Sequence, residues 1–301
     1  MDLAPNIMRL PTFRQIGQIG WRALRSLDKE FNSPESRWTR NPGSPKSLVF
    51  VHGLLSEAPR AWRTKRSNWP DIINSDPTFA GWNILLANWY STVFSEHHDI
   101  VSEANRLYDF LMQQLPTEEG QEQTIVFVCH SLGGILVRQM LVAHPDMLQR
   151  AQIGLLTLST PAKGSKLASV LAGISARLRH SQALALRIES ETLPPLDVAF
   201  KALVAGHPDR LVGMELVESH SIGPRTKLLK RLSAWSLLPK PLVGVESQGA
   251  YFGPPVIVPD TDHASISRPL SVDSPVHQLL QRFVRGHFSA EKSPEPTASL
   301  P

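Results

Sequence analysis

The chain has 301 residues, enough for one large domain or at most two, and 42% of them are hydrophobic, as in an ordinary globular protein with a sizeable core. The net charge of +4, without basic runs interleaved with aromatic residues, does not favour nucleic acid as a partner. The single cysteine, Cys129, excludes an intrachain disulfide, and no apolar run reaches the roughly 18 residues that a membrane-spanning helix needs. Because the N-terminus also lacks the apolar core of a signal peptide, we expect a cytoplasmic protein.

The N-terminal segment, residues 1–46, predicts an amphipathic helix followed by a turn-rich linker. Apolar residues between positions 12 and 31 fall on one helical face, and arginine and lysine supply the charge. We expect this helix to pack on the domain. The alternative is a helix that lies on a membrane surface and makes the protein membrane-peripheral.

From residue 47 onward, short apolar runs alternate with segments of helical periodicity. The strands predicted from these runs are 47–51, 82–88, 124–128, 153–158, 211–217, 242–245 and 256–258. Helices are predicted at 100–115, at 132–148 with a stop near Pro145, and from 276 to 283. Continuous apolar strands between helices predict an α/β domain over 47–288, with a mostly parallel sheet covered on both faces. The proline-rich tail, 289–301, predicts disorder.

A helical insertion at 165–210 interrupts this alternation. Apolar residues recur there at helical spacing, among them Leu171 and Ile174. Because the insertion leaves the catalytic edge of the predicted sheet, we expect a mobile helical cap that binds an acyl chain. The alternative is a fixed packing helix. Trp82, Trp89, Tyr90 and Phe94 are a second candidate lining for an acyl site, although such aromatic residues are more often core.

The central motif is VFVCHSLGG, residues 126–134. An apolar strand leads directly into Ser131, and Leu132 opens a helix, which is the context of the nucleophile elbow of α/β hydrolases. The tight turn needs small neighbours. Gly133 provides one of them, whereas Cys129 occupies the position at which the GxSxG pattern has glycine. Ser131 is therefore the predicted nucleophile.

Two backbone N–H groups are the expected oxyanion donors, those of Leu54 and Leu132. Leu54 follows the first core strand in the segment VHGLL, and Leu132 follows the nucleophile. His52 lies in the same loop after that strand. A direct catalytic role for it is disfavoured because the base follows the serine in the chain order of this fold.

The general base is predicted to be His263, which lies between the last short strand and the closing helix. The other histidines beside helices, His144, His277 and His287, are interpreted as surface residues. The acid should end the strand that follows the insertion, which makes Glu218 the first choice. Glu246, at the end of a later apolar run, is the alternative acid.

Several segments in this order resemble a known group of proteins: HGL after the first strand, CHSLGG, STPAKGS (159–165), GMELVES (213–219), LVGVES (242–247) and DTDHASISRP (260–269). They are similar to lipase-like α/β hydrolases related to the serine-active-site-containing protein family and, more distantly, to GPI-inositol deacylases. The resemblance covers about residues 47–285. It implies that Ser131 and His263 are nucleophile and base, that Glu218 matches a strand-end glutamate, and that the chemistry is ester hydrolysis or acyl remodelling of lipids.

The sequence thus predicts a serine esterase with a Ser-His-Glu triad and an acyl-enzyme, acting on a small-molecule or lipid acyl ester. No metal or organic cofactor is expected, because the sequence has no HxxEH, CxxC or Walker-type motif. An acyltransferase that uses the same triad is one alternative. A non-catalytic scaffold that retains the α/β-hydrolase fold is another.

Overall fold

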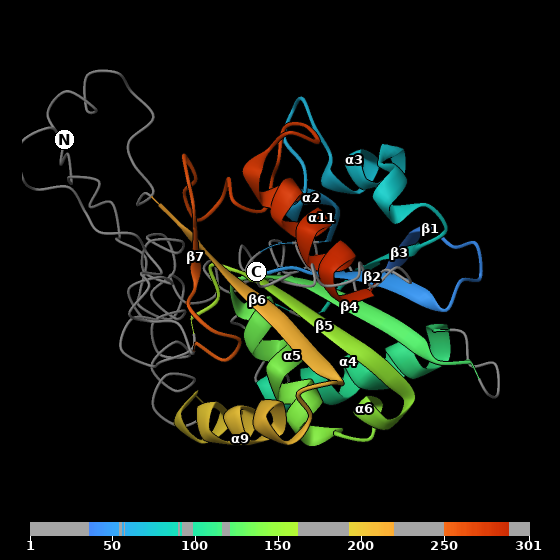
Figure 1. Cartoon of the computed structure of the whole chain (residues 1–301), viewed down its shortest axis with the longest axis vertical. Coiled ribbons are helices and arrows are strands. Elements are labelled where there is room, and N and C mark those ends of the chain that lie inside the picture. The colour runs from blue at the N-terminus through green and yellow to red at the C-terminus, as the bar shows by residue number, and fades with distance from the viewer. Residues whose placement is uncertain are drawn as a thin grey trace, which may run out of the picture.

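The computed structural model describes residues 36–53, 56, 58–89, 91, 99–115, 121–161, 193–219 and 250–288. Its strands form one twisted sheet of order β1-β3-β2-β4-β5-β6-β7, in which only β1 is antiparallel to its neighbour (Figure 1). The strand bounds are β1 Arg37–Arg40, β2 Lys46–Val51, β3 Asn83–Ala87, β4 Gln123–His130, β5 Ala151–Leu158, β6 Leu211–Glu218 and β7 Val256–Val258. The expected mostly parallel α/β architecture is confirmed.

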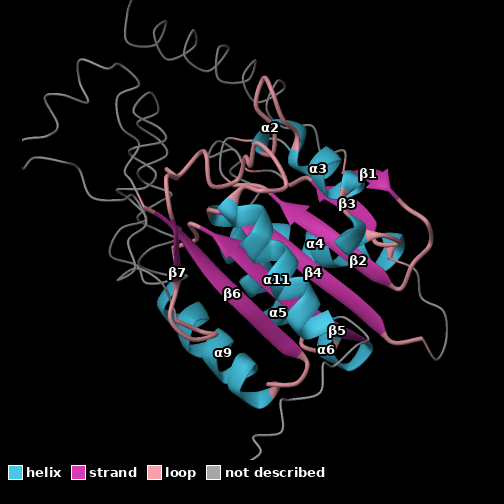
Figure 2. Ribbon diagram, turned by 45° about the horizontal axis from the view of Figure 1, so that its top comes forward, coloured by secondary structure: helices cyan, strands magenta, loops and turns pink. Residues whose placement is uncertain are grey.

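Helices cover both faces of the sheet (Figure 2). One face carries α2 (Ala58–Ala61), α3 (Trp69–Ser75) and α11 (Pro275–Phe288), and the other carries α4 (Ile100–Gln114), α5 (Leu132–Ala143), α6 (Met147–Arg150) and α9 (Leu193–Gly206). Successive strand residues point to opposite faces, so Val49 and Val51 join one apolar cluster while Leu48 and Phe50 join the other. This double burial explains why the strands are continuous apolar runs.

The segment that carries the candidate nucleophile follows the sequence expectation closely. Strand β4 is fully buried from Thr124 to Cys129, and α5 begins at Leu132. The helix ends at Ala143, just before Pro145, and the chain re-enters a short helix, α6. The single helix predicted over 132–148 is therefore divided at the proline, which cannot donate a backbone hydrogen bond.

Strand β1 was not predicted from the sequence. It lies inside the segment interpreted as an N-terminal linker, and its sequence, RWTR, has no apolar run. The strand is held at the sheet edge by antiparallel pairing with β3, where Arg37 pairs with Leu86. The sheet thus begins before residue 47, because pairing with β3 and side-chain hydrogen bonds, such as that from Arg40 Nε to Trp82 O at 2.8 Å, hold a polar strand at its edge.

The described part of the predicted insertion is helix α9. Its buried residues, Leu193, Leu196 and Phe200, belong to the same apolar cluster as α5, and α9 packs against α5. For these residues the packing helix, which was the alternative to a cap, is the observed arrangement. Residues 162–192 lie outside the described part of the chain, and so do the predicted N-terminal helix, the 242–245 strand, Tyr90, Phe94 and the 289–301 tail.

His277 is a core residue, so its interpretation as a surface histidine was wrong. Its side chain is 0% exposed, its Nε2 lies 2.8 Å from a carboxylate oxygen of Asp76, and its Nδ1 accepts a hydrogen bond from Trp69 Nε1 at 3.1 Å. Indole N–H only donates, so Nδ1 carries no proton and Nε2–H donates to Asp76. Both partners lie some 200 residues earlier in the chain. The periodicity of the helix that carries His277 therefore could not predict them.

Trp82 and Trp89 are also core residues, 3% and 7% exposed. This matches the core interpretation of these aromatic residues rather than an acyl-site lining. Among the described residues, no helix has both the length and the apolar character that crossing a membrane requires.

Candidate active site

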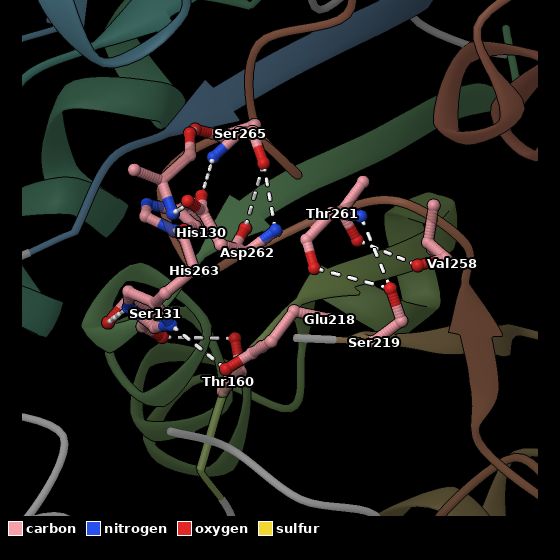
Figure 3. A network of polar contacts seen from close by, with 12 residues as sticks. His130, Ser131, Thr160, Glu218, Ser219, Val258, Thr261, Asp262, His263 and Ser265 are labelled. Atoms are coloured by element: carbon pink, nitrogen blue, oxygen red, sulfur yellow. Dashed lines mark hydrogen bonds and ion pairs between the residues drawn. The ribbon is translucent and has the colours of Figure 1, made fainter. Parts of the chain in front are cut away.

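The carboxyl ends of the parallel strands meet at one edge of the sheet, and Ser131 stands there at the end of β4. Its backbone has φ 52° and ψ −123°, a combination that residues other than glycine rarely adopt. Hydrogen bonds hold this turn: Ser131 N–H donates to Leu158 O at 2.9 Å, and its carbonyl accepts from Thr160 Oγ1 at 3.0 Å (Figure 3). A strained, tightly bonded serine between strand and helix is the geometry of a nucleophile elbow.

The glycines around Ser131 are required by close packing. A Cβ at Gly133 would overlap the carbonyl oxygen of Val51 and lie 2.5 Å from that of His52. A Cβ at Gly53 would come within 2.9 Å of Ser131 Cβ. The loop after β2 therefore runs directly against the elbow, with no room for a side chain at either position.

Cys129 is a buried member of β4 and no rival nucleophile. Its side chain is 0% exposed, and burial raises the pKa of the thiol well above its ordinary value. Because the thiolate is the reactive form, this thiol remains inert. Cys129 acts as a small core residue at a position where many elbows have glycine.

His263 approaches Ser131 from the loop that follows β7. Its Nε2 lies 3.1 Å from Ser131 Oγ, although 132 positions separate the two residues in the chain. Ser131 is 1% exposed and His263 is 2% exposed. An imidazole nitrogen at this distance can accept the hydroxyl proton, and exclusion of water strengthens electrostatic interactions at the site.

Short-range hydrogen bonds shape the His263 loop. A carboxylate oxygen of Asp262 accepts from the backbone N–H groups of Ala264 and Ser265, and Ser265 Oγ accepts from Asp262 N–H (Figure 3). On the other side, Thr261 N–H donates to Ser219 Oγ at 3.2 Å. This last contact ties the loop to the end of β6.

Glu218 is the last residue of β6 and its side chain is buried beside His263. Glu218 Oε1 lies 3.7 Å from His263 Nδ1, within ion-pair range but longer than a hydrogen bond. Among the described residues, Nδ1 has no hydrogen-bond partner. A small approach of the two groups would form that bond, and catalytic hydrogen bonds are often long before substrate binds. Glu246, the alternative acid, lies outside the described residues.

Of the two predicted oxyanion donors, Leu132 is described and Leu54 is not. Leu132 is the first residue of α5, and the first N–H groups of a helix have no partner within it. The partial positive charge of the helix N-terminus adds to the attraction for an anion. Leu54 follows Gly53, whose backbone packs against Ser131.

His52 is a buried residue of the loop that carries the predicted donor. Its Nδ1 lies 2.9 Å from Gly53 O, its Nε2 lies 2.5 Å from Asn88 Oδ1, and its ring stacks on Trp89. Burial lowers the pKa of His52 to about 4, and the hydrogen bonds to Gly53 and Asn88 oppose this change only in part. These contacts are structural, and they join the loop after β2 to Asn88 and Trp89.

This depressed pKa predicts acid-sensitive stability. Above pH 6.5 His52 is neutral in both the folded and the unfolded protein. Below pH 6.5 the unfolded chain binds a proton at this residue, whereas the native protein does so only near its pKa of about 4. The free energy of unfolding should therefore fall by roughly 3 kcal/mol from this group as the pH drops through that window. Urea denaturation between pH 7.5 and 4.5 measures the slope. His52→Gln should be less stable at pH 7.5 but show a shallower slope, and an equal slope in both proteins would contradict the prediction.

The structure brings Ser131, His263 and Glu218 together, with Leu132 beside them. Sequence reasoning overlooked His130, whose Nε2 lies 2.7 Å from His263 O. The chain order of the fold places the base after the serine, so a histidine directly before the nucleophile drew no prediction. Its position at the end of β4 would have placed it at the same sheet edge.

Comparison with known proteins bears on the fold and on the family resemblance. Residues 44–192 match the family model described as "Putative serine esterase (DUF676)". The chain resembles that family over this stretch, and it has the α/β-hydrolase fold. The resemblance to lipase-like members of this fold, expected from the sequence, is thereby confirmed.

The α/β hydrolase is also similar to curated proteins named Protein SERAC1. It is 24% identical to the zebrafish (Danio rerio) protein over 325 aligned residues, which cover 95% of this chain and 47% of that protein. It is 22% identical to the human protein over 79% of this chain and 38% of that protein. The chain thus spans about half the length of these relatives or less.

Among solved structures, the peroxisomal α/β-hydrolase Lpx1 of Saccharomyces cerevisiae aligns over 87% of this chain and 84% of its own, with 13% identity and a TM-score of 0.49.

Proposed function

We propose that this α/β hydrolase is a serine esterase that cleaves a carboxylic ester through Ser131, His263 and Glu218. The observation that carries the proposal is the 3.1 Å contact between His263 Nε2 and the Oγ of a serine in elbow geometry. Ser131, Glu218 and His263 follow one another in the chain order of a hydrolase triad. Each lies at the end of a strand or in the loop after it, which matches the roles of such a triad. The match of residues 44–192 to a family model described as a putative serine esterase supports the same chemistry.

Acylation would proceed in two proton transfers. His263 Nε2 accepts the proton of Ser131 as Oγ attacks the ester carbonyl carbon, and the carbonyl oxygen becomes an oxyanion. The N–H groups of Leu132 and Leu54 are the donors that we assign to it. His263 then gives its proton to the leaving alkoxide, so that an alcohol departs and an ester to Ser131 remains.

Deacylation would repeat these steps with water. His263 removes a proton from the water as its oxygen attacks the acyl carbon, and then returns the proton to Ser131 Oγ, which releases a carboxylic acid. Throughout, Glu218 orients the imidazole through Nδ1 and stabilises its charged form. The substrate class we assign is a small-molecule or lipid acyl ester, and an acyltransferase would differ only by replacing water with another alcohol.

Covalent labelling tests whether the site is active. A fluorophosphonate probe should label the wild-type chain at Ser131, as located by peptide mass spectrometry, because an activated serine attacks the phosphorus centre. Labelling should be lost in Ser131→Ala and strongly slowed in His263→Ala. A folded wild-type chain that resists the probe would favour the scaffold alternative, and labelling at another residue would displace Ser131.

A further inference from the structure

His130 is the last residue of β4 and directly precedes the candidate nucleophile, and its side chain contacts the loop of the candidate base. Its Nε2 lies 2.7 Å from the carbonyl oxygen of His263. A carbonyl oxygen can only accept, so Nε2 carries the proton and donates it. This fixes the tautomer of His130, with the proton on Nε2 and a lone pair on Nδ1.

The ring of His130 is held on two sides. It lies 4.9 Å from the ring of His263, centroid to centroid, and meets the edge of Trp62 at 6.5 Å. A Cβ at Gly53 would approach His130 Nδ1 to 3.3 Å, so the loop after β2 closes a third side. These contacts restrain the ring, so the Nε2–H group of His130 is held in the orientation that donates to His263 O.

Burial keeps His130 neutral. It is the largest cause that lowers the pKa of this imidazole well below its ordinary value, and the positive charge of Arg268 acts in the same direction. The hydrogen bond to His263 O opposes them. Neutral His130 with its proton on Nε2 can donate this hydrogen bond. The contact therefore persists at every pH at which His130 stays unprotonated.

Other described backbone hydrogen bonds of the His263 loop are made by the N–H groups on either side of the histidine, those of Thr261 and Asp262 before it and those of Ala264 and Ser265 after it. The bond from His130 acts on the peptide carbonyl of His263 itself. Since His130 and Ser131 are neighbours in the chain, this bond links the backbone of the base directly to the strand that carries the nucleophile.

We propose that His130 is a positioning residue, whose Nε2–H holds the His263 backbone so that His263 Nε2 stays within hydrogen-bonding distance of Ser131 Oγ. The proposal rests on the function proposed above for Ser131 and His263. Its physical basis is the sensitivity of catalysis to placement, since a shift of about 1 Å can cost on the order of 10²-fold in rate. A loop is more mobile than a central strand, so a bond between them reduces the freedom of the base.

A pair of variants separates the donor from the ring. His130→Phe keeps a flat ring without a donor, whereas His130→Gln keeps an N–H donor without the ring. We expect His130→Phe to lower kcat for p-nitrophenyl butyrate by about 10- to 100-fold with little change in KM, and His130→Gln to recover most of the loss. His144→Phe, which alters a histidine stacked on Tyr108 at the end of α5, is the matched control and should retain wild-type kcat.

A second measurement observes the contact without turnover. The pair His263-Ala264 is the only His-Ala sequence in the chain, so 1-¹³C-histidine with ¹⁵N-alanine labels one peptide group. Its carbonyl signal should move upfield in His130→Phe, as the hydrogen bond is lost, and stay near the wild-type position in His130→Gln. If His130→Phe does not fold, as judged by its melting curve, His130→Asn offers a shorter amide donor, and its kcat should fall below that of His130→Gln.

These experiments distinguish failure of the positioning role from failure of the proposed function. A folded His130→Phe with wild-type kcat would overturn the positioning role, and so would a folded His130→Gln as slow as His130→Phe. An unmoved carbonyl signal in His130→Phe would overturn the hydrogen bond itself. A wild-type chain that neither hydrolyses esters nor reacts with fluorophosphonate would instead overturn the proposed function, while the carbonyl signal still reports on the contact.

Discussion

Replacement of Ser131 by alanine is expected to lower kcat for p-nitrophenyl butyrate by roughly 10⁴-fold or more while the protein stays folded. The hydroxyl is the group that would form the acyl-enzyme, and its Oγ is the atom within 3.1 Å of His263 Nε2. Alanine keeps the Cβ that packs against Gly53 and the backbone bonds of the elbow to Leu158 and Gly134. The loss should therefore appear in the chemical step and leave the melting temperature almost unchanged.

Ser75→Ala provides the control for this substitution. Ser75 is an exposed serine at the end of α3, and its hydroxyl donates only to the carbonyl of Asp71. Its variant should hydrolyse the ester at the wild-type rate. Ser131→Ala with more than about a tenth of wild-type kcat would remove Ser131 from the nucleophile role, provided that a contaminating esterase is excluded by titration with the fluorophosphonate probe.

The sequence was most informative where local chemistry decides structure. The apolar runs predicted the buried strands, because a strand covered on both faces must be apolar on both sides. The elbow was predicted from its own residues, since a serine between a buried strand and a glycine-rich helix start has few other uses. His263 and Glu218 were then placed by chain order and strand ends.

Contacts between distant segments account for the features that were missed. His277 appears on a helix face like any polar residue, and only the fold brings Trp69 and Asp76 to its two nitrogens. Strand β1 is set by contacts with distant residues, through pairing with β3 and side-chain bonds such as that from Arg40 to Trp82, rather than by an apolar pattern of its own. His130 has a role only because the loop after β7 crosses back to β4, and no local pattern records that crossing.

The second large effect is expected from Glu218→Gln, which should lower kcat by up to roughly 10⁴-fold by analogy with other triads. Glutamine fills the same volume at the end of β6 but carries no charge, so it cannot stabilise the imidazolium that forms on His263. Its amide could also present N–H to Nδ1 and favour the wrong tautomer. Glu246→Gln should be close to wild type. The kcat and KM of both variants on p-nitrophenyl butyrate measure the difference.

Glu215→Gln is the matched control, because Glu215 is a second buried carboxylate on the same strand. Its Oε2 accepts from the backbone N–H of Tyr251 at 2.7 Å, a bond that a glutamine oxygen can keep. We expect this variant to lose some stability but little kcat. If Glu246→Gln proves to be the slow variant and Glu218→Gln the active one, the acid would be Glu246. The 3.7 Å approach of Glu218 to His263 Nδ1 would then describe a buried contact that supports the loop without orienting the imidazole for catalysis.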